Sequence, residues 1–160
     1  MAAGDLGALA EITEGLALAA ATGNQAGAPA LLLLLAEAQR AAGQLADAQG
    51  TVAAGLAVAA QTGQPFLDAE LHRLQGALLL ATGGEPEEAA ASYQRALAIA
   101  RAQGAKALEL RAATSLAHLW REQGRHDEAR DLLAPIYNWF TEAFDTRDLI
   151  DAKALLEELG

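Results

Sequence analysis

Apolar residues recur along this chain with the three- and four-residue spacing of an α-helix, and short glycine-containing segments interrupt them. Three of these segments are similar: residues 43–48 read GQLADA, residues 84–89 read GEPEEA and residues 124–129 read GRHDEA. Their closing alanines, Ala48, Ala89 and Ala129, lie 41 and 40 residues apart. A fixed period in this range is typical of a helical solenoid, because one helical hairpin cannot bury its apolar face without a neighbouring copy.

The glycine-containing segments also predict where each helix begins and ends, since glycine permits the left-handed turn that closes many helices. We expect a single helical-repeat domain over residues 1–160, starting with an incomplete half repeat at residues 1–27. Helical hairpins follow at residues 28–64, 65–105 and 106–146, and a capping helix occupies residues 147–160. The last helix of the third hairpin is expected over about residues 126–144, with a kink at Pro135, which lacks a backbone N–H.

The composition favours helices over sheets. Of the 160 residues, 52% are hydrophobic but only 4% are aromatic, so alanine and leucine must fill the core. Both have high helix propensity, whereas the β-branched and aromatic residues that favour strands are scarce. The sequence therefore predicts an all-α fold of antiparallel helical hairpins.

The hairpins resemble tetratricopeptide (TPR) repeats. The turn glycines Gly43, Gly83 or Gly84, and Gly124 are followed by the small alanines at 48, 89 and 129, which such repeats place where two helices cross closely. Ala36, Gly76 and Ala117 fall at the other small position, on the first helix of each pair. The period is longer than the usual value of about 34 residues, and it also suits HEAT-like repeats. The resemblance implies a right-handed TPR-like solenoid.

A closer resemblance covers residues 65–160. It rests on the runs DAELHRLQGALLL at residues 68–80, ARDLLAPIY at 129–137, WFTEAFDT at 139–146 and DAKALL at 151–156. These runs resemble the C-terminal repeat region of large bacterial signalling proteins, in which an adenylate/guanylate cyclase-like or DNA-binding domain and an NTPase precede the repeats. The chain has no G-x-x-x-x-G-K-[ST] phosphate loop. The resemblance therefore implies a regulatory, partner-sensing region and not the catalytic part.

Charge and side-chain chemistry narrow the function. The formal net charge of −10 argues against nucleic acid or an anionic membrane as a partner, since both attract basic surfaces. The absence of cysteine excludes disulfides and thiol catalysis and suits a cytoplasmic location. His72, His118 and His126 form no H-E-x-x-H motif, and no nucleophile has a base beside it in sequence. We expect no enzyme activity, no cofactor and no metal.

The first helix of each hairpin lines the concave face in TPR arrays. The spacing places eight polar residues on this side: Glu37, Arg40, Glu70, Arg73, Arg111, Thr114, His118 and Arg121. Of these we select Arg40, Arg73, Arg111, His118 and Arg121 as candidate partner-binding residues. Guanidinium groups bind carboxylates in bidentate geometry, so an acidic peptide or a C-terminal carboxylate is the expected ligand. The alternative is that each arginine pairs with a neighbouring glutamate.

Two apolar features remain. Tyr137, Trp139, Phe140 and Phe144, with Trp120 upstream, either seal the end of the array or anchor a partner, and we favour sealing. The first helix carries Leu6, Leu9, Ile12 and Leu16 and begins where the second half of a hairpin would begin. Either a longer parent protein continues upstream, or this face pairs with a second copy. We expect self-association through residues 1–35, most simply as a homodimer. The sequence thus favours a non-catalytic protein–protein interaction or regulatory module. A self-assembly module and a small-molecule sensor with a pocket near Trp120 and His118 are the alternatives.

Overall fold

The computed structural model describes residues 3–23, 27–63 and 65–160, with side chains from residue 7 onward in the first of these segments. Within these ranges the chain forms eight α-helices and one short 3₁₀ turn, and contains no strand. The elements are α1 (Ala3–Thr22), α2 (Ala28–Ala41), α3 (Leu45–Thr62), η1 (Pro65–Leu67), α4 (Asp68–Ala81), α5 (Pro86–Ala102), α6 (Lys106–Glu122), α7 (His126–Tyr137) and α8 (Arg147–Leu159). The all-α fold expected from the sequence is confirmed.

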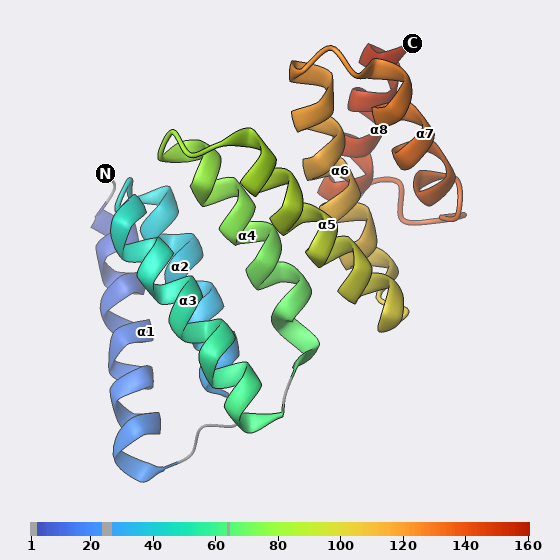
Figure 1. Cartoon of the computed structure of the whole chain (residues 1–160). Coiled ribbons are helices and arrows are strands. Elements are labelled where there is room, and N and C mark those ends of the chain that lie inside the picture. Colours follow the sequence, from blue (N-terminus) through green and yellow to red (C-terminus); the bar gives the residue numbers. More distant parts are fainter. Residues whose placement is uncertain (1–2, 24–26, 64) are drawn as a thin grey trace.

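Successive helices run antiparallel and stack into an elongated array, with the two ends of the chain at opposite ends of the molecule (Figure 1). The two helices pack extensively in each of the hairpins α2–α3, α4–α5 and α6–α7, and α5 packs on α6 of the next hairpin to a similar extent. We call α2, α4, α6 and α8 the first helices and α1, α3, α5 and α7 the second helices. Each first helix also contacts the next first helix along the array, so these four form one continuous row.

Small residues set the distance between the two helices of a hairpin. Ala36 and Ala48, which lie on α2 and α3, are both 0% exposed, and so are Ala117 and Ala129 on α6 and α7. Gly76 holds the same position on α4. A Cβ atom on this glycine would lie 2.7 Å from Cε1 of Tyr93 and 3.0 Å from the carbonyl oxygen of Ala89. The backbones therefore approach as closely as they do because these positions carry almost no side chain.

The three hairpin turns share one backbone conformation, although the left-handed glycine of the second turn, Gly83, lies one residue before the segment GEPEEA. Gly43, Gly83 and Gly124 have φ values of 77°, 77° and 76°. In each turn, the N–H of the following residue donates to the carbonyl five residues earlier, as in the 2.8 Å bond from Gln44 to Gln39. This is the Schellman arrangement, in which a glycine without a Cβ satisfies the last carbonyls of a helix.

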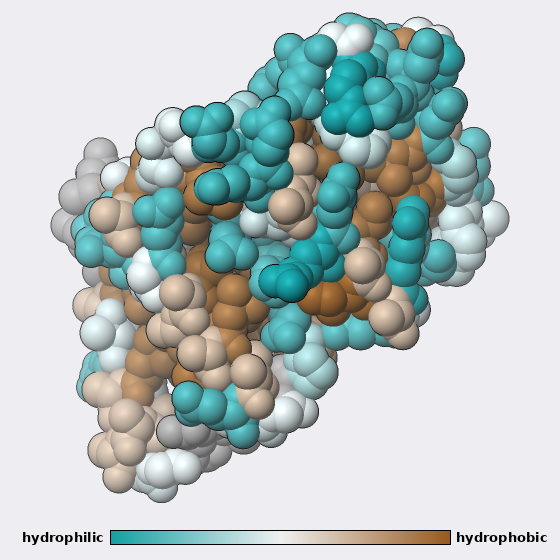
Figure 2. Space-filling model, viewed as in Figure 1, coloured by the Kyte–Doolittle hydropathy of each residue, from teal (hydrophilic) through white to brown (hydrophobic). Residues whose placement is uncertain are grey.

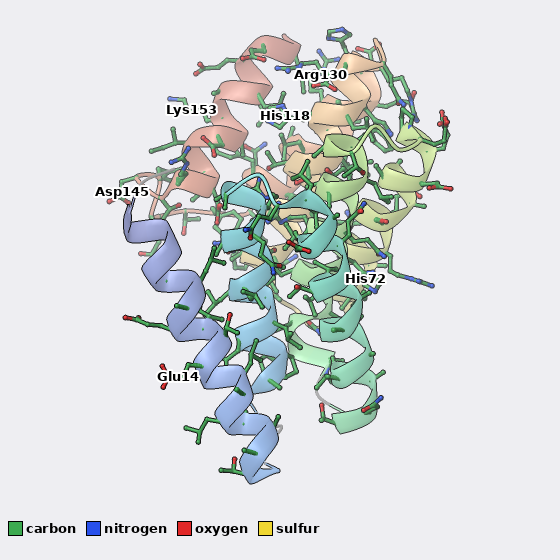
Figure 3. All side chains as sticks on the ribbon, turned by 90° about the vertical axis from the view of Figure 1, so that its left-hand side faces the viewer. Glu14, His72, His118, Arg130, Asp145 and Lys153 are labelled. Carbon is green, nitrogen blue, oxygen red and sulfur yellow. The ribbon has the colours of Figure 1, made fainter. Side chains whose placement is uncertain are left out.

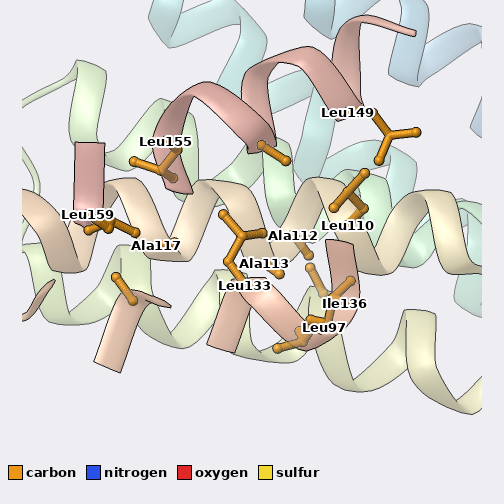
Figure 4. Close-up of a cluster of buried hydrophobic side chains, with 13 residues drawn as sticks. Leu97, Leu110, Ala112, Ala113, Ala117, Leu133, Ile136, Leu149, Leu155 and Leu159 are labelled. Carbon is orange, nitrogen blue, oxygen red and sulfur yellow. The ribbon is translucent and has the colours of Figure 1, made fainter. Parts of the chain in front are cut away.

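The largest buried cluster lies at the C-terminal end and joins α5, α6, α7 and α8 (Figure 4). Leu110, Leu133 and Leu155 are each no more than 1% exposed and contribute to it from three different helices. At the other end, no described residue of α1 is buried. Figure 2 shows apolar surface over the N-terminal half of the molecule, where alanine and leucine dominate the sequence.

The expectation that the helix beginning at residue 126 continues to residue 144 is wrong. α7 ends at Tyr137, two residues after Pro135, and residues 138–146 form a connection to α8. Pro135 donates no backbone hydrogen bond, and the helix continues for only two residues beyond it, to Tyr137. Ala143 in this connection has a φ of 62°.

Because α7 ends at Tyr137, the prediction that the aromatic residues seal the end of the array is only partly correct. Tyr137 and Phe140 pack against the C-terminal cluster. Trp139 and Phe144 stay 58% and 46% exposed, because the segment that carries them is a loop and not a helix. The ammonium group of Lys106 lies 5.5 Å from the ring centre of Trp139.

The close approach at Gly76 predicts opposite effects for two glycine-to-alanine changes. Gly76→Ala should destabilise the chain, because overpacking costs about 1–3 kcal/mol and exceeds the gain in helix propensity of about 1 kcal/mol. Gly50→Ala is the matched control, since a Cβ at this exposed position in α3 meets nothing within 4 Å. In urea unfolding, the Gly50→Ala variant should be more stable than the parent chain. Equal stabilisation by both changes would contradict close packing at Gly76.

Candidate binding groove

The row of first helices lines a groove of about 550 Å³. Its lining comes from α2 (Glu37, Arg40), α4 (Glu70, Arg73), α6 (Arg111, Thr114, Ser115, His118) and α8 (Arg147, Asp148, Asp151). All eleven residues lie on first helices. The helical period brings them together, because positions three or four residues apart share one face and the stacking places equivalent faces side by side.

A line of alternating charges crosses the groove from α2 to α8. Glu37 on α2 lies 3.9 Å from Arg73 on α4, which bonds to Glu70 at 2.6 Å. Glu70 lies 3.8 Å from Arg111 on α6, and Arg111 bonds to Asp148 on α8 at 2.7 Å. We call these five residues the charge ladder. It links all four first helices through their side chains.

Glu70 is the centre of the charge ladder and is only 4% exposed. A carboxylate at this depth needs a charged, hydrogen-bonded partner, because burial without one is costly. Both Nε and Nη2 of Arg73 donate to Oε1 of Glu70. Burial lowers the pKa of Arg73, but its hydrogen bond to Glu70 and the attraction of Glu70 and Glu37 outweigh this effect, so its pKa lies above the ordinary value. The guanidinium of Arg73 therefore stays ionised beside Glu70.

His118 is a partly buried, titratable residue in the wall of the groove. It projects from α6 on the side of α8 (Figure 3). Burial lowers its pKa, and the neighbouring charge of Arg121 lowers it further. The imidazole is therefore neutral at pH 7 and can both donate and accept a hydrogen bond.

The structure brings four of the five candidate partner-binding residues to the groove: Arg40, Arg73, Arg111 and His118. Arg121 is not part of the lining and pairs with Glu158 on α8. Arg73 and Arg111 line the groove but already hold carboxylates of the chain itself, as the alternative interpretation of the sequence proposed. Binding of a partner by any of these residues stays a prediction.

The contribution of α8 to the groove was not predicted from the sequence. Arg147, Asp148 and Asp151 complete the groove because α8 lies where the first helix of a fourth hairpin would lie. The 40-residue period carried this signal, since Arg147 follows the start of α6 at Lys106 by 41 residues. With α8 included, the lining contains four arginines and four carboxylates. Arg40 is exposed, and no carboxylate of the described residues forms an ion pair with it.

The residues selected for self-association lie on α1. Leu9, Ile12 and Leu16 are half-buried along this helix, which contacts α2. The side chain of Leu6 lies outside the described part of the structure. Formation of a homodimer stays a prediction.

A small-molecule pocket near Trp120 and His118 stays a prediction, and the two side chains have different surroundings. His118 lines the groove, whereas Trp120 packs against two buried clusters and lies 4.5 Å below the guanidinium of Arg125. In the ranges that the structure describes, no group of three or more His, Asp or Glu side chains could hold a metal ion. No described helix has the length and hydrophobicity that would span a membrane.

A second buried carboxylate joins α5 to α6. Glu109 is 4% exposed and accepts hydrogen bonds from Arg101 at 2.9 Å and Lys106 at 2.7 Å. Burial raises the pKa of Glu109, but the hydrogen bonds and charges of Lys106 and Arg101 outweigh it, so the pKa lies below the ordinary value of glutamate. The ionised form thus stabilises the folded chain.

Replacing Glu70 should test the charge ladder. Glu70→Gln removes the charge that Arg73 and Arg111 face, and we expect a loss of about 1–3 kcal/mol in the free energy of unfolding. Glu157→Gln is the matched control, because this exposed glutamate forms only a 3.8 Å pair with Lys153 within α8. The free energy of unfolding of this control variant should fall by less than about 0.5 kcal/mol. Equal losses in urea unfolding would show that burial of Glu70 is unimportant.

Glu109 predicts a specific pH dependence of stability. Because its pKa is lower in the folded than in the unfolded chain, its contribution is complete above the unfolded pKa of about 4.3 and disappears as the pH falls through the folded pKa. Glu109→Gln should therefore lose less stability than the parent chain between about pH 5 and pH 3. Thermal unfolding of both proteins across this pH range checks this prediction. Parallel curves of stability against pH for the two proteins would contradict it.

Comparison with solved structures identifies the fold. The chain is similar to two crystal structures of nearly identical TPR-like repeats, described as from a kinesin light chain of Podosopora anserina, one of them a variant with a glutamine-to-methionine substitution. The sequence identity is 19% to each of them, and the TM-scores are 0.68 and 0.66. Both alignments cover 97% of this chain, and they cover 76% and 77% of the two solved chains. No protein-family model matches the sequence. No curated protein matches it either. The chain therefore has the fold of a TPR-like repeat solenoid.

Proposed function

We propose that the chain is a non-catalytic protein–protein interaction module that binds a peptide segment of its partner along the groove of the first helices. TPR-like repeat folds generally serve as protein–protein interaction modules. The observation that carries the proposal is the groove itself, because four helices contribute eight charged side chains to one concave surface of about 550 Å³. Such a surface is polar and open, and it suits an extended segment better than a compact apolar ligand.

Charge indicates which segment would bind. The groove lining has as many arginines as carboxylates, while the chain as a whole carries a formal charge of −10. An acidic segment is thus repelled less here than by the average surface of the molecule. Arg40 offers a guanidinium that no described carboxylate occupies, at the α2 end of the groove. We therefore place an acidic side chain or a C-terminal carboxylate of the ligand at Arg40.

The proposed role agrees with the resemblance of residues 65–160 to the repeat region of bacterial signalling proteins. In that setting the groove would sense a partner and regulate an output domain. The charge ladder supports such a role physically, because its side chains connect all four first helices. A ligand that competes for Arg73 or Arg111 would change the contacts between these helices.

Peptide binding tests the proposal. A nine-residue peptide rich in Asp and Glu, with a free C-terminal carboxylate, should shift the ring signals of His118 in NMR spectra, because this histidine lies in the groove wall. The same peptide with Gln and Asn in place of the acids should shift them less. Arg40→Ala should weaken binding about fivefold, which corresponds to about 1 kcal/mol.

Arg95→Ala is the control, because Arg95 is an exposed arginine on the second helix α5 and does not line the groove. It should leave the affinity unchanged. Equal weakening by both variants would indicate non-specific attraction of an acidic peptide to arginine. No shift of His118 at millimolar peptide would remove the proposal for this class of ligand.

A further inference from the structure

A second polar cavity lies between α4 and α5, on the opposite side of α4 from the groove. Its volume is about 310 Å³, and we call it the α4–α5 cavity. Five residues line it: His72, Gln75, Ala91, Ser92 and Arg95. An α-helix turns by about 100° per residue, so His72 and Gln75 lie about 160° around α4 from Glu70 and Arg73, which face the groove. His72 also lies away from α8, beside which His118 lies (Figure 3).

The lining of the α4–α5 cavity consists of hydrogen-bond donors. Each of its four polar side chains can donate, and no carboxylate of the described residues belongs to it. Asp68 and Glu88 lie one turn before His72 and Ser92 on the same helices, but neither lines the cavity. The groove, by contrast, contains four carboxylates. On a chain with a formal net charge of −10, such a lining is a local exception that favours an anion.

Arg95 supplies the positive charge of this lining. Seven of the nine arginines form an ion pair with a carboxylate, whereas Arg40 and Arg95 form none with the described residues. Arg95 follows Ser92 by three positions on α5, so the two side chains share one face of this helix. Its guanidinium can therefore bind an external anion without giving up a partner within the chain.

The other two hairpins carry mostly apolar residues at the equivalent positions. Counted from the close helix crossings, the counterparts of the four polar residues are Leu32, Leu35, Thr51 and Ala54 in the first hairpin and Ala113, Leu116, Leu132 and Pro135 in the third. In the third hairpin, Leu116 is 1% exposed and Leu132 packs against the same buried cluster. The repeat uses these positions there for apolar packing, so the fold does not require polar residues at them. A local departure from the repeat pattern is expected where a site has a function.

Contacts within the lining leave several donors available. Nδ1 of His72 lies 3.2 Å from Oε1 of Gln75. Because an amide oxygen only accepts, Nδ1 carries the proton in this arrangement, and the amide nitrogen of Gln75 can still donate. Nε2 of His72 donates as well when the ring is cationic, and a bound anion stabilises that form. The hydroxyl of Ser92 donates to the carbonyl oxygen of Glu88 at 3.1 Å and can turn toward a ligand instead.

We infer that the α4–α5 cavity binds a phosphomonoester, with Arg95, His72, Gln75 and Ser92 as donors to its oxygens. A phosphomonoester carries a charge of about −1.5 to −2 at pH 7 and three strongly accepting oxygens, so it can use all of these donors together. A carboxylate has only two oxygens, and Arg95 alone would occupy both in bidentate geometry.

The size of the cavity suits a small phosphorylated group. Small-molecule sites start at about 300 Å³, so the cavity has room for the phosphate and for a short group that carries it. That group is either a phosphorylated side chain of a partner or a small phosphorylated molecule, and the recognition chemistry is the same for both. The α4–α5 cavity is separate from the groove, so the inference does not rest on peptide binding there.

A phosphate titration of the full chain, followed by NMR of the histidine rings, provides the test. Inorganic phosphate and O-phosphoserine should each shift the Hε1 signal of His72 saturably, toward its position in the cationic ring. The His72→Gln variant assigns this signal by its loss. His126, which is exposed on α7, should not shift. Acetate at the same pH and ionic strength should shift the His72 signal less, because it offers fewer oxygens and less charge.

Two single variants test the charge. Arg95→Ala should weaken phosphate binding at least about fivefold, because it removes the only arginine of the cavity. Lys153→Ala is the control, because it removes the same charge from an exposed position on α8 that forms only a 3.8 Å pair with Glu157. It should leave the affinity unchanged. Both positions are exposed, so neither change removes buried packing.

A double variant separates ligand binding from packing. Gln75→Leu together with Ser92→Leu copies the third hairpin, in which Leu116 and Leu132 occupy these positions. It should weaken phosphate binding at least about tenfold, because leucine side chains donate no hydrogen bond to an anion. Its Tm without phosphate should not fall, because the leucines can pack as they do in the third hairpin.

A phosphoserine peptide distinguishes the two sources of the phosphate. Binding at least fivefold tighter than that of O-phosphoserine, with no binding of the unphosphorylated peptide, would assign the phosphate to a partner protein. Equal affinity would assign it to a small molecule.

Four results would overturn the inference. They are no saturable shift of His72 at millimolar phosphate, an equal shift with acetate, equal weakening by Arg95→Ala and Lys153→Ala, and unchanged phosphate binding in a folded double variant.

Discussion

The close crossing of the two helices in each hairpin is the constraint on which the rest of the structure depends. Ala36 meets α3, Gly76 meets α5 and Ala117 meets α7 at positions where a larger side chain has no room. This approach buries an alanine- and leucine-rich face that contains few aromatic residues. Because the same crossing recurs every 40 residues or so, each hairpin presents its first helix on the same side, and the four first helices form one row.

The groove and the open N-terminal face are two consequences of this row. Charged residues on the exposed side of each first helix come together across helices, so that Glu70, buried on α4, is held by Arg73 and lies near Arg111. At the N-terminal end the same geometry leaves α1 packed on one first helix instead of two. The array thus carries a polar groove along its length and an apolar face at its N-terminal edge.

Much of the fold could be predicted from the sequence, because its strongest signals are local. Glycines such as Gly43 and Gly124 end helices through their own backbone conformation, so the glycine-containing segments indicate where helices end. The end of α7 could not be found in this way, since residues 138–144 have helical spacing and the chain nevertheless leaves the helix after Pro135. The side of the first helices that faces the groove was predicted from the resemblance to TPR arrays together with the helical spacing. The ion pairs between helices were not, because the pairing of Arg111 with Asp148 depends on how α6 and α8 stack.

Hydrogen–deuterium exchange tests most directly the claim that packing between first and second helices determines the structure. α1 and α3 have nearly the same sequence over their last turns, but α3 lies between two first helices and α1 contacts only one. Amides of residues 15–22 should therefore exchange much faster than those of residues 55–62, although their local helix propensity is similar. Equal protection of the two segments would contradict the account, because it would mean that α1 is as fully packed as α3.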